Sequence, residues 1–299
     1  MAIGTPTAPT AMVSAASGTV TTGSFTPAAN IALFAFVTAR RTGSAAVTPT
    51  VSDSVGLTWT ALDNVNYDPG SNPRMAGQLY VAFPGASPSA MTVTCTSTGA
   101  SQTAVNVVSV TGASVTAGDY TNHVVGSVNT TGDPTATLGS SPAASSGVIG
   151  LTFMNATNTI TPPTGFTQIE ENTAATTYRV ETSYDITSPT AGAHTWASSN
   201  TTSFGFLVEV PEPSAGAYSM VASAGSFALT GTNAGLAAAR KMTASTGSFT
   251  LTGTAVALRR GYSMGASAGT FMLTGTAAGL KASRKLVAAS ASYALAGST

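Results

Sequence analysis

The chain has 299 residues, of which 43% are hydrophobic and only 7% are charged. This length can hold one well-formed core and a second region, while the single cysteine, Cys95, excludes an intrachain disulfide and a thiolate metal cluster. The formal net charge of zero hides a segregation, because all 11 acids precede residue 214 and seven of the 11 basic residues follow it. Gly, Ala, Ser and Thr abound while Glu and Lys are scarce, which favours an all-β protein.

The N-terminal residues give no sign of a targeting segment. Met1-Ala2-Ile3-Gly4-Thr5-Pro6 lacks the basic stretch and the apolar stretch of a signal peptide, and no apolar run reaches the roughly 18 residues of a membrane span. We therefore expect no signal peptide and no membrane association.

Residues 1–213 consist of short runs of strand type, separated by Gly, Pro, Asn and Asp. The first strong run, Ile31–Val37, is apolar throughout and predicts a central strand. Further strands are expected at 57–61, 79–83, 91–95, 105–110, 148–153, 178–186 and 204–210. This spacing predicts an antiparallel β-sandwich of jelly-roll type, which Pro211-Glu212-Pro213 brings to an end.

Residues 214–299 repeat one unit every 22 residues, with copies that open at Met220, Met242, Met264 and Leu286. Each copy predicts a strand, a tight glycine turn, a second strand and a third segment that we also assign as strand. Fixed self-similarity at this period indicates a repeat array whose units bury their apolar faces only against neighbours. The shared apolar positions are Phe227, Phe249, Phe271 and Tyr293, and then Leu229, Leu251, Leu273 and Leu295.

Two sets of motifs resemble known proteins. The segments SDSVGLTWT (52–60), ASPSAMTVT (86–94) and PTGFTQI (163–169) resemble a β-sandwich module of phage and bacterial surface proteins. The G-[ST]-F-x-L-T-G-T repeats, with their basic joints, resemble arrays appended to tailed-phage and prophage structural proteins. The resemblance implies a virion component, tail-associated, fibre or head decoration, and it carries over no catalytic residue.

Few residues could take part in catalysis or bind a metal ion. His123 and His194 have no second ligand at metal spacing, and the sequence has no nucleophile elbow, phosphate-binding loop or dinucleotide fingerprint. Glu170, Glu171 and Glu181 with Asp185 offer the carboxylates of a glycosidase, but alternation places Glu181 and Asp185 on the polar, solvated face of a strand. We predict no enzyme, no catalytic, cofactor-binding or metal-binding residue, and no cofactor.

Other candidates have a structural explanation that we favour. Asp53 is expected to be a turn residue, with a calcium ligand as the far less favoured interpretation, and Cys95 is expected to be a small buried thiol. Trp59, Trp196 and Tyr67 are the aromatics that a sugar-stacking platform would use, but we expect them in the core.

The seven basic residues of the array lie near the joints between copies, at Arg240, Lys241, Arg259, Arg260, Lys281, Arg284 and Lys285. Solvated turns are the preferred explanation, docking on an acidic protein surface comes second, and nucleic acid is the least favoured partner.

We expect a non-enzymatic structural protein located in the virion. Its partners would be other virion proteins and copies of itself, because one copy of the repeat cannot bury its apolar face alone. A trimer is favoured because fibrous β-stalks commonly close around a threefold axis. One alternative is a glycan- or receptor-binding module on a repeat spacer, with a host surface glycan as partner. A bacterial surface adhesin is the other alternative.

Overall fold

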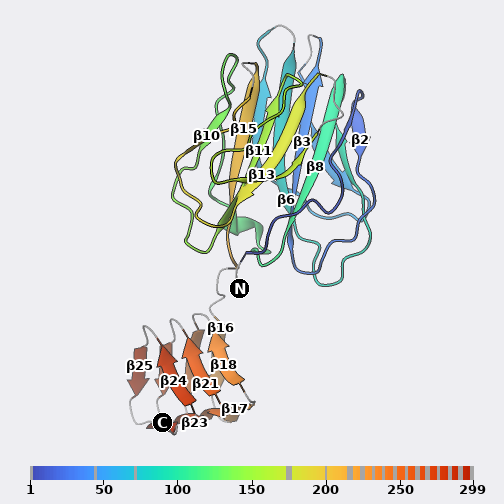
Figure 1. The fold of residues 1–299 in the computed structure, drawn as a ribbon. Coiled ribbons are helices and arrows are strands. Elements are labelled where there is room, and N and C mark those ends of the chain that lie inside the picture. Colours follow the sequence, from blue (N-terminus) through green and yellow to red (C-terminus); the bar gives the residue numbers. More distant parts are fainter. Residues whose placement is uncertain are drawn as a thin grey trace. The chain divides into compact units, whose positions relative to one another are not determined.

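The computed structural model describes residues 3–43, 46–70, 73–172, 177–198 and 201–213, and then the strands of the repeat array between residues 218 and 296. Side chains in the array are described only for Thr250 and Met272. The chain divides into two compact units, Met1–Ser214 and Ala215–Thr299, one residue from the boundary expected from the sequence (Figure 1).

The first half of unit 1 is built on an antiparallel five-stranded sheet. Its strands, in spatial order, are β1 (Val13–Ala15), β8 (Gln102–Val110), β3 (Ala32–Arg41), β6 (Arg74–Ala82) and β5 (Thr60–Tyr67). The apolar run 31–37 falls in and just before β3, whose residues 32–39 are buried on both faces. A strand covered on both sides needs apolar side chains at consecutive positions, which explains the run.

The second half carries another antiparallel five-stranded sheet. Its order is β12 (Thr167–Glu171), β13 (Arg179–Asp185), β11 (Gly147–Met154), β15 (Ser203–Val210) and β9 (His123–Val125). The central strand β11 is buried at every residue, and the short 3-10 helix η1 (Ala117–Asp119) precedes this sheet in the chain.

The two five-stranded sheets share the main core. Phe34 and Phe36 of β3 belong to the same buried cluster as Phe153 of β11 and Phe206 of β15. The ring centroids of Phe36 and Phe206 lie 5.3 Å apart in an edge-to-face arrangement. The sheets approach closely at Gly77, where an added Cβ would lie only 2.8 Å from the Phe204 ring.

A smaller sheet covers the outer side of each five-stranded sheet. Strands β2 (Thr19–Thr21), β7 (Val93–Thr96) and β4 (Thr50–Asp53) pack on the first, and β10 (Thr135–Thr137) with β14 (Ala193–Thr195) packs on the second. Each smaller sheet shares a buried cluster with the sheet it covers, one around Cys95 and one around Trp196. Unit 1 therefore has four layers, with the two larger sheets inside (Figure 1).

The all-β class and the antiparallel sandwich predicted from the sequence are confirmed. The number of layers was not predicted, because the sequence suggested one sandwich and the structure contains two that pack face to face. In the first half, the first and eighth strands are neighbours in one sheet, and the second and seventh are neighbours in the other. We interpret this order as that of a jelly roll.

The second half repeats the strand order of the first. Read from edge to edge, β1-β8-β3-β6-β5 corresponds to β9-β15-β11-β13-β12. The edge strands β5 and β12 correspond to each other, and each follows a glycine with positive φ, Gly56 or Gly165. Each also carries a bulge, between Ala61 and Asp63 in β5 and between Gln168 and Glu170 in β12. The repetition of order and bulge shows that the two halves are versions of one arrangement.

Unit 2 consists of three parallel sheets in which successive copies of the repeat stack in register. Phe227 pairs with Phe249, Phe249 with Phe271 and Phe271 with Tyr293. The third segment is a strand in each of the first three copies, as expected. The sheets are β16 (Tyr218–Ala222), β19 (Arg240–Ala244), β22 (Ser263–Ala266) and β25 (Lys285–Ala288); β17 (Ser226–Thr230), β20 (Ser248–Thr252), β23 (Thr270–Thr274) and β26 (Ser292–Ala296); and β18 (Asn233–Ala237), β21 (Ala255–Arg259) and β24 (Ala277–Lys281).

The predicted burial of the Phe and Leu positions concerns side chains outside the described residues. Met272, which precedes Leu273 in β23, is 39% exposed. Successive residues of a strand face opposite sides, so the face that carries position 272 is the outer one.

Candidate functional site

The loop after β4 is held by the side chain of Asp53. Its carboxylate accepts hydrogen bonds from the backbone N–H groups of Val55, Gly56 and Leu57 at 2.7–3.0 Å, and from the indole Nε1 of Trp59 at 2.8 Å. Gly56 has φ +80°, a conformation that glycine adopts without strain. Asp53 therefore forms a turn, as predicted, and the turn holds Val55 and Leu57 in fixed positions.

A second loop, from Pro84 to Met91, lies beside the first. Thr92 N–H donates to Ser54 Oγ at 3.0 Å, and Ser54 N–H donates to Thr92 O at 3.1 Å. Met91 exchanges both backbone hydrogen bonds with Phe25, at 2.8 and 2.9 Å. The bonds between Ser54 and Thr92 hold the two loops together although about 30 residues separate them along the chain, and the bonds to Phe25 fix the end of the second loop.

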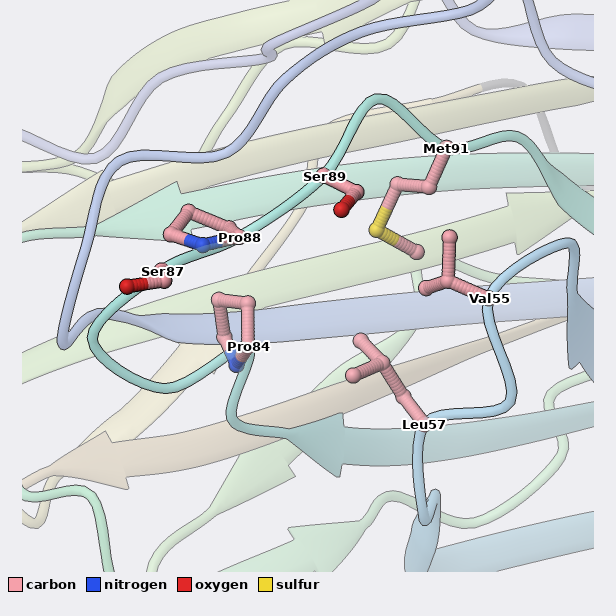
Figure 2. A pocket seen from close by; sticks show the side chains of 7 residues that line it. All are labelled: Val55, Leu57, Pro84, Ser87, Pro88, Ser89 and Met91. Carbon is pink, nitrogen blue, oxygen red and sulfur yellow. The ribbon is translucent and has the colours of Figure 1, made fainter.

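The two loops enclose a pocket of about 170 Å³ (Figure 2). Val55 and Leu57 come from the first loop, and the second loop supplies Pro84, Ser87, Pro88, Ser89 and Met91. Met91 is 1% exposed and forms part of the core, whereas Val55 is 43% exposed. The pocket is therefore a hollow that opens to solvent and is lined mainly by apolar residues, with two serines among them.

The lining of this pocket contains no titratable side chain, so it offers no general acid and no base that could activate the hydroxyl groups of Ser87 and Ser89. Its volume is also below the roughly 300–1,000 Å³ of pockets for small molecules. A hollow of this size suits a single apolar side chain from another protein. Such anchor-in-pocket contacts contribute much of the energy of protein interfaces.

The prediction of a solvated face at Glu181 and Asp185 is wrong. Glu181 is fully buried and Asp185 is 8% exposed, because both outer and inner faces of β13 are covered. Burial raises the pKa of Glu181 from 4.5 to about 8, against the smaller effects of Ser183 and the nearby Trp196 indole, which favour the charged form. Oε1 of Glu181 and Nε1 of Trp196 are nevertheless both without a hydrogen-bond partner within the described residues.

The other predicted carboxylates hold the backbone together. Glu170 accepts hydrogen bonds from the backbone of Met12 at 2.7 Å and from Asn106 Nδ2 at 2.9 Å, and burial still raises its pKa. Glu171 pairs in register with Glu181 and accepts from the backbone N–H of Ile160 at 2.9 Å. Asp185 accepts from the backbone N–H groups of Thr187 and Ser188. These carboxylates are thus engaged by the fold rather than arranged around a substrate cleft.

The two histidines lie on different strands and have different partners. His123 Nδ1 lies 3.2 Å from Asp63 Oδ2, and His194 Nε2 lies 3.0 Å from the backbone oxygen of Thr190. Phe166 packs edge-on against the His194 ring with centroids 5.0 Å apart. In the described part of the chain, no group of three or more His, Cys, Asp or Glu residues is placed to hold a metal ion.

The three aromatic residues considered for a sugar platform differ in burial. Trp196 is fully buried in the outer core of the second half, as expected for a core aromatic. The expectation is met only in part for the other two, because Trp59 and Tyr67 are half-buried: Trp59 packs against the outer core of the first half, and Tyr67 packs against the central core. Cys95 is buried as predicted, and burial raises the pKa of its thiol to about 12, so the thiol stays protonated and unreactive.

The sequence did not reveal the pocket. The Pro84-Gly85 and Ser87-Pro88-Ser89 turns and the apolar pair around Gly56 were visible, but their meeting depends on the pairing of β4 with β7. No helix among the described residues has the length and apolar character needed to cross a bilayer. Comparisons with family models, curated proteins and solved structures found no match to this chain.

Proposed function

We propose that this protein is a non-enzymatic structural component of a phage virion, a tail-associated, fibre or head-decoration protein. The observation that carries the proposal is the apolar pocket of unit 1. It lies between two loops that hydrogen bonds hold in place, and one of its lining residues, Val55, exposes apolar surface. In this proposal the pocket receives an apolar side chain of a neighbouring virion protein.

The repeat array supports the same function. Its copies stack in register in three parallel sheets, so each added copy lengthens the stack by about 4.8 Å. Such a stack is suited to spacing or attachment. The resemblance of the G-[ST]-F-x-L-T-G-T repeats to arrays of tailed-phage and prophage structural proteins supports this proposal over a bacterial adhesin.

The glycan-binding alternative has less support from unit 1. Sugar platforms use exposed aromatic rings set together, whereas Trp196 is fully buried and the half-buried Trp59 and Tyr67 pack against two different core clusters.

The experiment compares two substitutions at equally exposed valines. Val55 is 43% exposed and lies at the pocket, while Val115 is 45% exposed and does not line it. Val55→Asp places a charge at the pocket, and we expect the amount of this protein in purified particles to fall at least tenfold. Val115→Asp is the matched control and should be incorporated like the unchanged chain. Quantitative mass spectrometry of purified particles gives both amounts, and gold labelling in electron micrographs gives the position.

Two results would contradict the proposal in different ways. Equal incorporation of both variants would show that the pocket is not the docking site. Absence of the unchanged chain from purified particles would show that the protein is not a virion component.

A further inference from the structure

The two halves of unit 1 can be compared residue by residue near the pocket, because their bulges give a common reference point. Leu62 is the inserted residue in β5, and Ile169 is the inserted residue in β12. An aromatic residue stands three positions before each bulge, Trp59 in the first half and Phe166 in the second. Trp59 and Phe166 therefore occupy corresponding positions, and each packs against the outer core of its own half.

The loops that follow β6 and β13 also correspond. Both contain a Ser-Pro-[Ser/Thr]-Ala segment, residues 87–90 in the first half and residues 188–191 in the second. Met91 follows the first segment directly, and His194 follows the second after two further residues. Both residues are buried, and each is followed by a threonine. Met91 in the first half is therefore the counterpart of His194 in the second.

The corresponding residues are arranged differently in the two halves. In the second half, the Phe166 ring packs edge-on against the His194 ring, with centroids 5.0 Å apart. In the first half, the indole Nε1 of Trp59 donates to Asp53 Oδ2 at 2.8 Å, and Trp59 is not one of the residues that line the pocket. Met91 thus faces an open pocket, whereas its counterpart faces an aromatic ring.

Extra residues in both loops of the first half accompany the open pocket. In the second half Phe166 directly follows the glycine with positive φ, whereas Leu57 and Thr58 intervene in the first half. The loop after β6 has four residues before its Ser-Pro segment, and the loop after β13 has two. Leu57 and Pro84, one from each longer loop, stand on the walls of the pocket (Figure 2). The longer loops therefore enclose a space where the second half has a ring contact.

We propose that the pocket binds an aromatic side chain of the partner protein, so that the partner supplies to the first half the ring that Phe166 supplies to the second. The thioether of Met91 is directed into the pocket, and sulfur makes favourable contacts with aromatic rings (Figure 2). The half-buried Pro84 and Pro88 add C–H groups, which the negative face of an aromatic ring attracts. This inference rests on the proposed docking function of the pocket and adds the chemistry of the partner.

The test is NMR spectroscopy of the full-length protein with isotope-labelled methionine methyl groups, in which Met91 reports on the pocket. The probe is N-acetyl-phenylalanine amide, and N-acetyl-leucine amide is the aliphatic comparison. We expect the aromatic probe to shift the Met91 methyl signal with half-saturation at about 1 mM, and the aliphatic probe to bind at least tenfold more weakly. Met154 belongs to the cluster against which Phe166 already packs, so its signal should not move.

Three variants locate the probe. Leu57→Phe adds a ring of the protein's own at the wall of the pocket, and it should abolish the shift of Met91. Val115→Phe adds a ring at an exposed position that does not line the pocket, and it should leave binding unchanged. Pro88→Ala removes part of the wall without adding bulk and should weaken binding at least threefold. This third variant keeps the test valid if Leu57→Phe disturbs folding, which circular dichroism would reveal.

Three results would overturn the proposal. The absence of a shift at Met91, or an equal shift at Met154, would show that the pocket does not bind an aromatic ring. Unchanged binding in both Leu57→Phe and Pro88→Ala would place the probe elsewhere. Equal affinity for the two probes would show that the pocket has no preference for a ring. The docking function is tested separately, by incorporation of Val55→Asp into particles, so the failure of one idea can be distinguished from the failure of the other.

Discussion

Replacement of Glu181 by glutamine tests whether a carboxyl group is buried uncharged inside unit 1. Glu181 lies on β13, is fully buried, and has an oxygen, Oε1, without a hydrogen-bond partner among the described residues. Burial raises the pKa of this carboxyl group from 4.5 to about 8. Glutamine has nearly the same shape as the protonated acid but cannot ionise.

The direction of the pH effect follows from proton binding. Between about pH 4.5 and pH 8 the folded protein keeps the proton on Glu181, whereas the unfolded chain releases it. The contribution of this group to the free energy of unfolding is therefore fully present below pH 4.5 and is lost as the pH rises through about 8. At 1.36 kcal/mol per pKa unit, the loss is at most ~5 kcal/mol.

The assay is urea unfolding of the full-length protein, followed by tryptophan fluorescence at pH 5, 7 and 9. The two tryptophans, Trp59 and Trp196, both belong to unit 1, so the signal reports the unfolding of this unit alone. We expect Glu181→Gln to be increasingly more stable than the unchanged protein as the pH rises. The difference between the two proteins isolates Glu181, because other groups, such as Glu170, titrate in both.

A control at an exposed position completes the design. Gln168 lies on the neighbouring strand β12 and is exposed, so Gln168→Glu adds a carboxyl group that water solvates in both states. This variant should show little change of stability relative to the unchanged protein between pH 5 and 9. If the stability difference produced by Glu181→Gln were constant over this range, the idea of an uncharged buried Glu181 would have to be abandoned.

Two further predictions concern packing. An added Cβ at Gly205 would lie 2.5 Å from the buried Trp196 ring, so Gly205→Ala should lower the free energy of unfolding by about 1–3 kcal/mol, measured by the same assay. Gly139→Ala meets nothing within 4 Å and serves as the control; equal effects would contradict the close approach. In the array, Phe249→Ala should cost about 3–5 kcal/mol if the ring is buried between copies. Light scattering would show whether the unchanged protein is the expected trimer and whether Phe249→Ala dissociates it, and a monodisperse monomer would refute the trimer.

Strands buried on both faces were the easiest to predict from the sequence. The runs 31–37 and 204–210 are apolar at nearly consecutive positions, and they correspond to β3 and β15, which lie inside their sheets. The run 178–186 alternates in polarity and predicted a half-exposed strand, but β13 is covered on both sides. Alternation in a sequence gives the polarity of a face, and it cannot tell that another layer covers that face.

The pocket could not be predicted from local sequence patterns, because it also depends on contacts between distant residues. Asp53 could be predicted as a turn residue because its hydrogen bonds go to residues only a few positions ahead. The pocket needs Leu57 and Met91 side by side, and that depends on strand pairing and on the bonds between Ser54 and Thr92. The repeat array shows the opposite case, since a fixed period in the sequence is itself a record of which residues stack.

The two bulges explain how the halves of unit 1 are joined. In each half the bulge inserts an apolar residue, Leu62 or Ile169, that packs against the shared central core. The next residue in each half is an acid, and it contacts the other half near the edge strand of its large sheet: Asp63 contacts His123 of β9, and Glu170 contacts Met12, directly before β1. The same device thus appears twice, in opposite directions, as in the interface of a two-fold symmetric dimer. The central core of unit 1 therefore resembles a self-complementary interface between two halves of the same chain. This arrangement explains why the core is large and apolar, and why both faces of each inner sheet are covered.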